Sequence, residues 1–255
     1  MRLRDKVAVV TGASSGIGKA IATTFAREGA CVVIDYHDNG EHARDVVESI
    51  ELEGGRATAV GADVSKEEDV EKLIDAAVTH YGSLDILVNN AGIERKMPFL
   101  DTPLEVWHQV IETNLTGTWI CSQLAARRMA GRKSGGRIIN ISSVHEDITM
   151  PSNAPYCAAK GGMKMLMRTI AVELAPLNIT VNNVCPGAID TPIQDKLKKD
   201  PRKVEELLSE IPLHRLGSPD EVAGLCVFLA SDEGSYVTGA SYVIDGGMTK
   251  QSGSL

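Results

Sequence analysis

The stretch that decides the fold is "KVAVVTGASSGIG", residues 6–18. Its apolar run predicts a short buried strand, and the pattern "GIGKAIATTFAREGA" at 16–30 predicts a helix that begins inside the glycine loop. Glycines at such a junction let the backbone turn tightly and approach a pyrophosphate, which the free N–H groups of the helix N-terminus would bind. A purely structural turn is the alternative. We therefore predict a dinucleotide-binding loop formed by Gly12, Ser15, Gly16, Ile17 and Gly18.

The strand–helix rhythm continues along the chain. Apolar runs without alternation predict strands covered on both faces, and the intervening periodic stretches predict helices. The expected strands are 31–35, 57–64, 84–92, 136–143, 179–187 and 240–247, and the expected helices are 41–55, 67–82, 103–117 with a possible continuation to 131, 153–175 and 219–231. This order predicts an α/β fold, a doubly wound parallel sheet (Rossmann fold), in a single domain over residues 1–255.

One long insertion, residues 190–217, is charged and is interrupted by Pro201. We interpret it as a flap over a site, with a solvated helical excursion as the alternative.

Composition excludes several classes of function. The net charge of −8 over 255 residues argues against nucleic acid, which requires clustered positive charge. The N-terminal apolar run is too short for a signal peptide or a membrane span, so we expect no membrane partner and a cytoplasmic protein. Scattered cysteines without a C-x-x-C pair indicate free thiols in a reducing compartment, and no His/Cys/carboxylate cluster suggests a metal; the cysteines are Cys31, Cys121, Cys157, Cys185 and Cys226.

Acidic and small residues follow three of the expected strands. Asp35 ends the second strand, where a carboxylate can accept hydrogen bonds from the adenosine ribose and repel a 2′-phosphate. Asp63 ends the third and could accept from the adenine amine. Asn90, Ala91 and Gly92 end the fourth, beside the expected cofactor. No lysine or arginine follows Asp35 in "YHD", so NAD is favoured over NADP.

A serine, a tyrosine and a lysine indicate the chemistry. Tyr156 and Lys160 stand four residues apart and share a helix face, and Ser143 ends the fifth strand at the same sheet edge. Lowering a tyrosine pKa from ~10 to ~7 requires roughly 4 kcal/mol. An ammonium ion at ~4 Å in a partly desolvated site supplies about that much. We expect Lys160, aided by a cationic nicotinamide ring, to make Tyr156 a base.

The motifs "TGASSGIG", "NNAG" and "YCAAK", together with Asn114 and Ser143, resemble those of the short-chain dehydrogenase/reductase family in the same order. The resemblance implies that Tyr156 is the general acid/base and that Lys160 lowers its pKa and holds the nicotinamide ribose. It implies that Ser143 binds the reacting oxygen and that Asn114 anchors a water. It also implies a homotetramer, and contacts to the nicotinamide from "PGAIDT", namely Pro186, Gly187, Ile189 and Thr191.

Further segments, "NNAGIE", "SSVHE" and "CPGAIDTPI", are similar to those of bacterial glucose 1-dehydrogenases. This similarity implies a sugar pocket lined by Glu94, Ser143 and His145, with Gln194 a weaker candidate, and oxidation of a sugar such as glucose at C1. His145 could instead fix a loop, and Glu94 could be a solvated surface acid. The alternatives in function are a carbonyl or 3-oxoacyl-thioester reductase and, further off, a dinucleotide sensor without catalysis.

Overall fold

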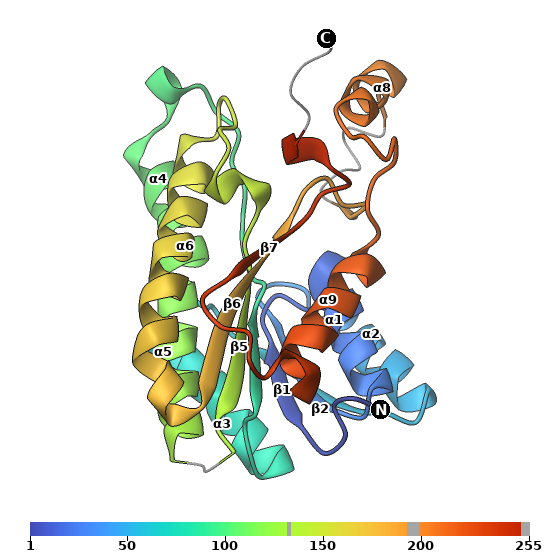
Figure 1. Ribbon diagram of the computed structural model, residues 1–255, viewed down its shortest axis with the longest axis vertical. Coiled ribbons are helices and arrows are strands. Elements are labelled where there is room, and N and C mark those ends of the chain that lie inside the picture. The colour runs from blue at the N-terminus through green and yellow to red at the C-terminus, as the bar shows by residue number, and fades with distance from the viewer. Residues whose placement is uncertain (132–133, 193–198, 251–255) are drawn as a thin grey trace.

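The fold is built on one parallel sheet of seven strands (Figure 1). A computed structural model describes residues 1–131, 134–192 and 199–250. The sheet order is β3-β2-β1-β4-β5-β6-β7, and every neighbouring pair is parallel. The strands are β1 (Val7–Val10), β2 (Cys31–Tyr36), β3 (Arg56–Gly61), β4 (Ile86–Asn89), β5 (Gly136–Ile141), β6 (Ile179–Pro186) and β7 (Ser241–Ile244).

Helices cover both faces of this sheet, which confirms the predicted doubly wound α/β fold (Figure 1). The longer ones are α1 (Gly16–Arg27), α2 (Gly40–Leu52), α3 (Glu67–Tyr81), α4 (Leu104–Ile111), α5 (Gly117–Ala130), α6 (Ala154–Leu174), α8 (Pro201–Ser209) and α9 (Pro219–Ala230). Apolar residues of α1, α2 and α9 pack on one face, and those of α3, α5 and α6 pack on the other. Burial on both faces explains why the strands carry unbroken apolar runs.

The strand order reverses between β1 and β4, because β1 leads outward to β2 and β3 while β4 leads to β5, β6 and β7. In open α/β sheets, ligands bind beyond the carboxyl ends of the strands at such a reversal. The glycine loop follows β1 and the "NNAG" segment follows β4. The topology therefore brings the two predicted cofactor segments together.

The predicted helix over 103–117 and beyond is more varied than expected. It consists of α4, a π-helical turn η2 (Glu112–Thr116) and α5. The predicted 190–217 segment contains α8, and Ile189 pairs with Gly217 where the segment leaves and rejoins the sheet edge. Gln194 lies outside the described residues. Among those that are described, no helix combines the length and apolar character needed to cross a membrane.

Candidate active site

The glycine loop has the conformation that a phosphate-binding loop needs. Gly12 and Gly16 have φ values of 60° and 55°, a region that favours glycine. A Cβ at Gly18 would lie 2.5 Å from the Asn90 side-chain nitrogen and 2.5 Å from the Gly12 carbonyl oxygen. Ser15, the N-cap of α1, is exposed and makes no capping hydrogen bond, so its hydroxyl and the helix N-terminus remain available to an anion. These residues fit the pyrophosphate of a dinucleotide.

Thr11 joins the glycine loop to the "NNAG" segment. Its hydroxyl oxygen accepts hydrogen bonds from the backbone nitrogens of Asn90 and Ala91, both at 2.9 Å. The Asn90 side chain in turn donates to the carbonyl oxygens of Thr11 and Gly12 at 2.9 and 3.0 Å. Asn90 and Ala91 therefore lie at the glycine loop. No role was predicted for Thr11 from the sequence, although it is the first residue of the motif "TGASSGIG".

Asp35 does not occupy the position that the sequence predicted for it. It is 1% exposed, and its Oδ2 accepts a hydrogen bond at 3.0 Å from the backbone nitrogen of Gly12. Burial raises the pKa of Asp35 to about 7, against the smaller opposing effect of the hydrogen bond from Gly12. A carboxyl group in this environment supports the glycine loop from inside, so the prediction that it faces the adenosine ribose is corrected.

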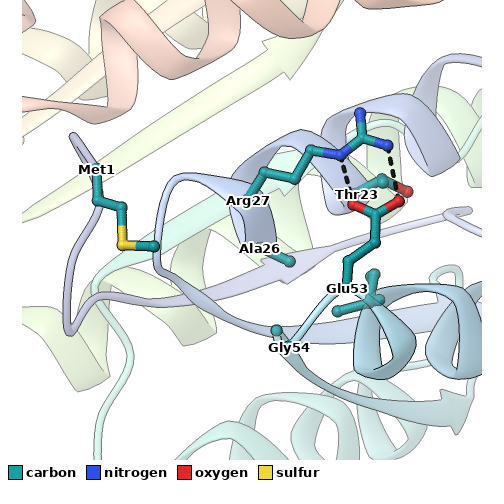
Figure 2. A pocket seen from close by; sticks show the side chains of 8 residues that line it. Met1, Thr23, Ala26, Arg27, Glu53 and Gly54 are labelled. Atoms are coloured by element: carbon teal, nitrogen blue, oxygen red, sulfur yellow. Dashed lines mark hydrogen bonds and ion pairs between the residues drawn. The ribbon is translucent and has the colours of Figure 1, made fainter.

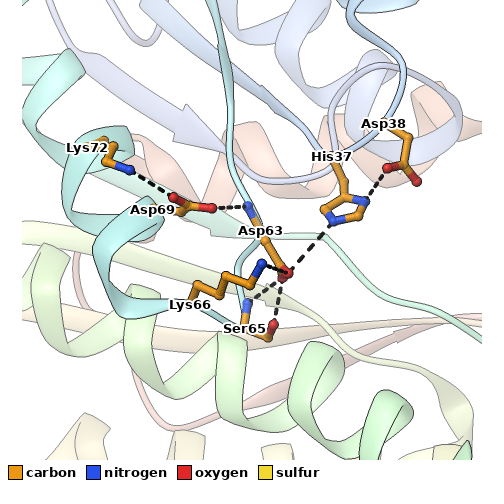
Figure 3. Close-up of polar contacts among 7 residues, drawn as sticks. All are labelled: His37, Asp38, Asp63, Ser65, Lys66, Asp69 and Lys72. Atoms are coloured by element: carbon orange, nitrogen blue, oxygen red, sulfur yellow. Dashed lines mark hydrogen bonds and ion pairs between the residues drawn. The ribbon is translucent and has the colours of Figure 1, made fainter.

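The exposed charges at the end of β2 are instead His37 and Asp38 (Figure 3). The His37 ring lies 2.7 Å from Asp38 and 3.8 Å from Asp63, and the hydrogen bond with Asp38 raises the pKa of His37. Asp63 also accepts from the Ser65 hydroxyl at 2.7 Å and lies 3.5 Å from Lys66. Asp63 thus lies at the carboxyl end of β3, as expected, where it pairs with both His37 and Lys66.

The predicted catalytic residues come together beyond β5. Ser143 is buried at the start of a 3₁₀ turn, η3 (Val144–Glu146), and Tyr156 and Lys160 lie on successive turns of α6. The Lys160 Nζ is 5.5 Å from the centre of the Tyr156 ring and donates to the Ile141 carbonyl oxygen at 2.8 Å. The helical spacing read from the sequence places Lys160 beside Tyr156.

The acidity of this pair differs from the sequence-based expectation. Burial raises the pKa of Tyr156 to about 12, although the neighbouring Ser143 hydroxyl acts in the opposite direction. Burial also lowers the pKa of Lys160 to about 8. In the protein alone, desolvation of the phenol is therefore the largest effect on the pKa of Tyr156. A bound nicotinamide cation would have to supply a large part of the lowering that Tyr156 needs.

Asn114 lies in the π-helical turn η2, a local irregularity that often occurs at functional sites. Its side chain is fully buried and makes two hydrogen bonds with the backbone of Ile93, at 2.8 and 2.9 Å. A Cβ at Gly92 would approach the Asn114 side-chain oxygen to 3.3 Å. The Asn114 side chain thus fixes the segment that follows "NNAG". Because that side chain is hydrogen-bonded to Ile93, the backbone of Asn114 remains to bind the predicted water.

Glu94 and His145 lie at the Tyr156 side of the site. The His145 and Tyr156 rings are edge to face with centres 6.3 Å apart, and burial lowers the pKa of His145. Glu94 accepts a hydrogen bond at 2.8 Å from Asn153, the buried N-cap of α6, and lies 3.4 Å from Lys96. The contact of Asn153 with Glu94 was not predicted from the sequence, because an asparagine before a helix is typical of an ordinary N-cap.

The segment after β6 reaches the glycine loop. A Cβ at Gly16 would contact the Thr191 methyl group at 3.6 Å, and Gly187 packs against Asp245. Pro186 is buried at the end of β6. The Ile189 side chain is also buried in the core, so only its backbone can reach a ligand.

Other sites are weaker candidates. A small cavity lies between the C-terminal ends of α1 and α2, at the opposite edge of the sheet, and the Arg27–Glu53 ion pair forms part of its lining (Figure 2). The Cys157 thiol, next to Tyr156 in the chain, is partly buried. Within the described part of the chain, no group of His, Cys, Asp and Glu side chains could hold a metal ion.

Comparison with known proteins defines the class. Residues 12–249 match the family model described as "Enoyl-(Acyl carrier protein) reductase". The chain belongs to the short-chain dehydrogenase/reductase family, whose members are oxidoreductases that generally use NAD(P).

Three relatives cover almost the whole chain. Glucose 1-dehydrogenase 2 of Bacillus subtilis (strain 168) is 43% identical over 249 residues, 97% of this chain and 96% of that protein. The 3beta-hydroxysteroid dehydrogenase 1 of Eggerthella lenta is 46% identical over 97% of this chain and 95% of its own. The L-rhamnose 1-dehydrogenase (NAD(P)(+)) of Azotobacter vinelandii is 45% identical over 97% of this chain and 98% of its own.

Proposed function

We propose that the protein is an NAD(P)-dependent dehydrogenase that oxidises a sugar such as glucose at C1. The observation that carries this proposal is the grouping of Ser143, Tyr156 and Lys160 with Glu94 and His145, beyond the strand ends that also hold the glycine loop. An intact serine, tyrosine and lysine set disfavours a sensor without catalysis.

The chain's own residues would perform the proton transfer. The Tyr156 phenolate accepts the proton of the substrate hydroxyl, and the Ser143 hydroxyl holds the same oxygen as its charge changes. Lys160, whose Nζ lies 5.5 Å from the centre of the Tyr156 ring, stabilises the phenolate and is itself oriented by the Ile141 carbonyl. A nicotinamide cofactor held by the glycine loop and Lys160 would supply the hydride acceptor and a positive charge.

Sugar specificity is supported by polar groups beside Tyr156. Glu94 is fixed by Asn153 and keeps a carboxylate within reach of Lys96, and His145 has one ring nitrogen 3.3 Å from the Ile148 carbonyl oxygen. If that nitrogen donates, the other remains an acceptor for a hydroxyl. Groups of this kind distinguish hydroxyl patterns by hydrogen bonding. Two of the three relatives are named as sugar 1-dehydrogenases, which agrees with this proposal.

We propose NAD as the preferred cofactor, with NADP second. The support no longer comes from Asp35, which is buried. It comes from Asp38 and Asp63, which lie near the end of β2 and would repel a 2′-phosphate. Their ion pairs with His37, and that of Asp63 with Lys66, reduce any attraction that these two cations offer.

The direct test is absorbance at 340 nm with NAD or NADP and a panel of D-glucose, L-rhamnose and a 3β-hydroxysteroid. We expect reduction with the sugars, and a Glu94→Gln variant with a raised KM for glucose but little change toward the steroid. The matched control is Lys96→Gln, which removes the exposed partner of Glu94 and should have a smaller effect. Turnover of the steroid alone would contradict the sugar proposal, and turnover only of ketones with NADH or NADPH would favour the carbonyl reductase.

We also propose a homotetramer in the cytoplasm. Apolar side chains exposed on the outer helices support assembly, since they lie along α4, α5 and α6, which are adjacent in Figure 1: Trp107, Trp119, Met165 and Val172. All five cysteines are free thiols, in agreement with a reducing compartment. Light scattering after gel filtration should give four times the 27.2 kDa chain mass.

A further inference from the structure

Helix α6 presents two lysines on the same face as Tyr156. Lys160 and Lys164 follow Tyr156 at intervals of four residues, so the three side chains lie on successive turns. Lys160 is buried and the Lys164 side chain is 14% exposed. Two ammonium groups one turn apart repel each other, and burial weakens the screening of that repulsion. A negative charge beside them is needed to keep both protonated.

Glu146 supplies that charge. It ends the turn η3, three residues after Ser143, and its side chain is 1% exposed. One carboxylate oxygen lies 3.7 Å from the Lys164 Nζ, and the other accepts a hydrogen bond at 2.9 Å from Asn183 of β6. The Glu146 backbone also packs against α6 beside Gly161, the residue that follows Lys160.

A row of asparagines across the sheet holds Glu146 in place. Asn89, Asn140 and Asn183 occupy paired positions on β4, β5 and β6. Asn89 donates to Asn140 and Asn140 donates to Asn183, each at 2.9 Å, and Asn89 also donates to Ser122. Each amide oxygen of Asn140 and Asn183 is thereby occupied, so the Asn183 NH₂ group is oriented toward Glu146. The hydrogen bond from Asn183 therefore holds this buried carboxylate beside Lys164.

We propose that Glu146 is a positioning residue for proton transfer: it is the shared counter-charge of Lys160 and Lys164, and it keeps Lys160 an ammonium ion beside Tyr156. This inference rests on the proposed function only in taking Tyr156 as the acid/base. The sequence motifs predict no such role for Glu146, although it is the last residue of the segment "SSVHE".

The charges around Lys160 single out Glu146. Burial lowers the pKa of Lys160, while Cys185 of β6 and Glu146 of η3 act in the raising direction. Burial also raises the pKa of the Cys185 thiol, so this group is uncharged near neutral pH and leaves Glu146 as the negative charge. On α6, Tyr156 and Lys164 are titratable groups one turn to either side of Lys160. Asp147 pairs with Lys164 too, but its side chain is exposed.

The test follows the titration of Lys160 directly, in protein labelled with ¹³C at the lysine ε-carbon. The resonance that disappears in Lys160→Arg identifies Lys160. We expect Glu146→Gln, which preserves the acceptor for Asn183, to lower the Lys160 midpoint by about one pH unit. Asp147→Asn is the matched control, because it removes an exposed carboxylate from the same Lys164, and should leave the midpoint unchanged. An unchanged midpoint in Glu146→Gln, or an equal shift in the control, would overturn the proposal.

A second variant keeps the test decisive if Glu146→Gln does not fold. Lys164→Met removes the competing cation, so the Lys160 midpoint should rise, and a fall or no change would refute the shared counter-charge. Because the titration needs no turnover, it is independent of whether the enzyme oxidises sugars. In an active enzyme, Glu146→Gln should also move the acid limb of kcat/KM to higher pH, whereas a merely structural defect would lower kcat/KM without moving it.

Discussion

Replacing Asp35 by Asn should stabilise the protein, and the gain should grow with pH. Asp35 is 1% exposed, its Oδ1 has no hydrogen-bond partner within the described structure, and its Oδ2 accepts from Gly12. Asn keeps an acceptor for Gly12 and the shape of the side chain, but it cannot ionise. The change therefore removes the cost of a buried negative charge and preserves the support of the glycine loop.

The magnitude follows from the pKa of Asp35, which burial raises from 3.8 to about 7. Between these two values the folded protein binds more protons than the unfolded chain, so the free energy of unfolding falls as pH rises. A shift of roughly three units corresponds to about 4 kcal/mol above pH 7, and to less than half of that at pH 5. The advantage of Asp35→Asn over the wild type should therefore grow by about 2–3 kcal/mol from pH 5 to pH 8.

Urea unfolding of the cofactor-free protein at a series of pH values measures this difference. Asp38→Asn is the matched control, because Asp38 ends the same strand region but its side chain is 88% exposed, and it should change stability by less than about 0.5 kcal/mol. A difference for Asp35→Asn that does not vary with pH would refute the reasoning. The ratio of NAD to NADP affinity should stay unchanged in Asp35→Asn. A marked loss of the preference for NAD would instead support a contact between Asp35 and the adenosine ribose.

The remaining predictions concern the packing beneath the cofactor loops. Gly18→Ala should destabilise the fold by about 1–3 kcal/mol and weaken dinucleotide binding, because its Cβ meets backbone and an anchored amide at 2.5 Å. Gly224→Ala is the control: its Cβ meets nothing within 4 Å in α9, and thermal unfolding should show a gain of about 0.5–1 kcal/mol. Thr11→Val leaves two backbone N–H groups without their acceptor and should cost about 2–3 kcal/mol, measured by urea unfolding. Asn140→Ala interrupts the asparagine row and should cost a similar amount by the same assay, whereas a neutral result would mean that water replaces the amide.

Much of the fold could be predicted because the spacing of apolar residues along the sequence differs between strands and helices. The apolar runs, the glycine loop and the four-residue spacing of Tyr156 and Lys160 are local signals, and each led to the correct element. Helix ends and the π-helical turn at Asn114 were not predicted, since a one-residue irregularity leaves no periodic trace.

The error at Asp35 has a clear physical origin. A strand buried on both faces has no polar alternation, so the run "CVVID" does not show which face each residue takes. In the structure, Val32 and Ile34 lie in the core of α1 and α2, while Val33 lies in the opposite core. Asp35 continues the face of Val33 and points inward, and β2 extends one residue further, to Tyr36.

Residues that act by holding other residues in place were also not predicted from the sequence. Thr11, Asn153 and Glu146 are ordinary types at ordinary positions, and their roles depend on partners 59 to 80 residues away, as with Thr11 and Ala91, or across the sheet, as with Glu146 and Asn183. Only the folded contacts show that these polar groups are buried and matched.

The most direct test of the central claim compares the wild type with Tyr156→Phe in two assays: the initial rate at 340 nm with NAD and D-glucose, and equilibrium NAD binding measured by isothermal titration calorimetry. We predict that NAD binds both proteins with similar affinity while the rate falls by at least about a hundredfold in the variant, the scale of a lost general base. A variant that retains wild-type turnover would contradict the assignment of Tyr156 as the acid/base.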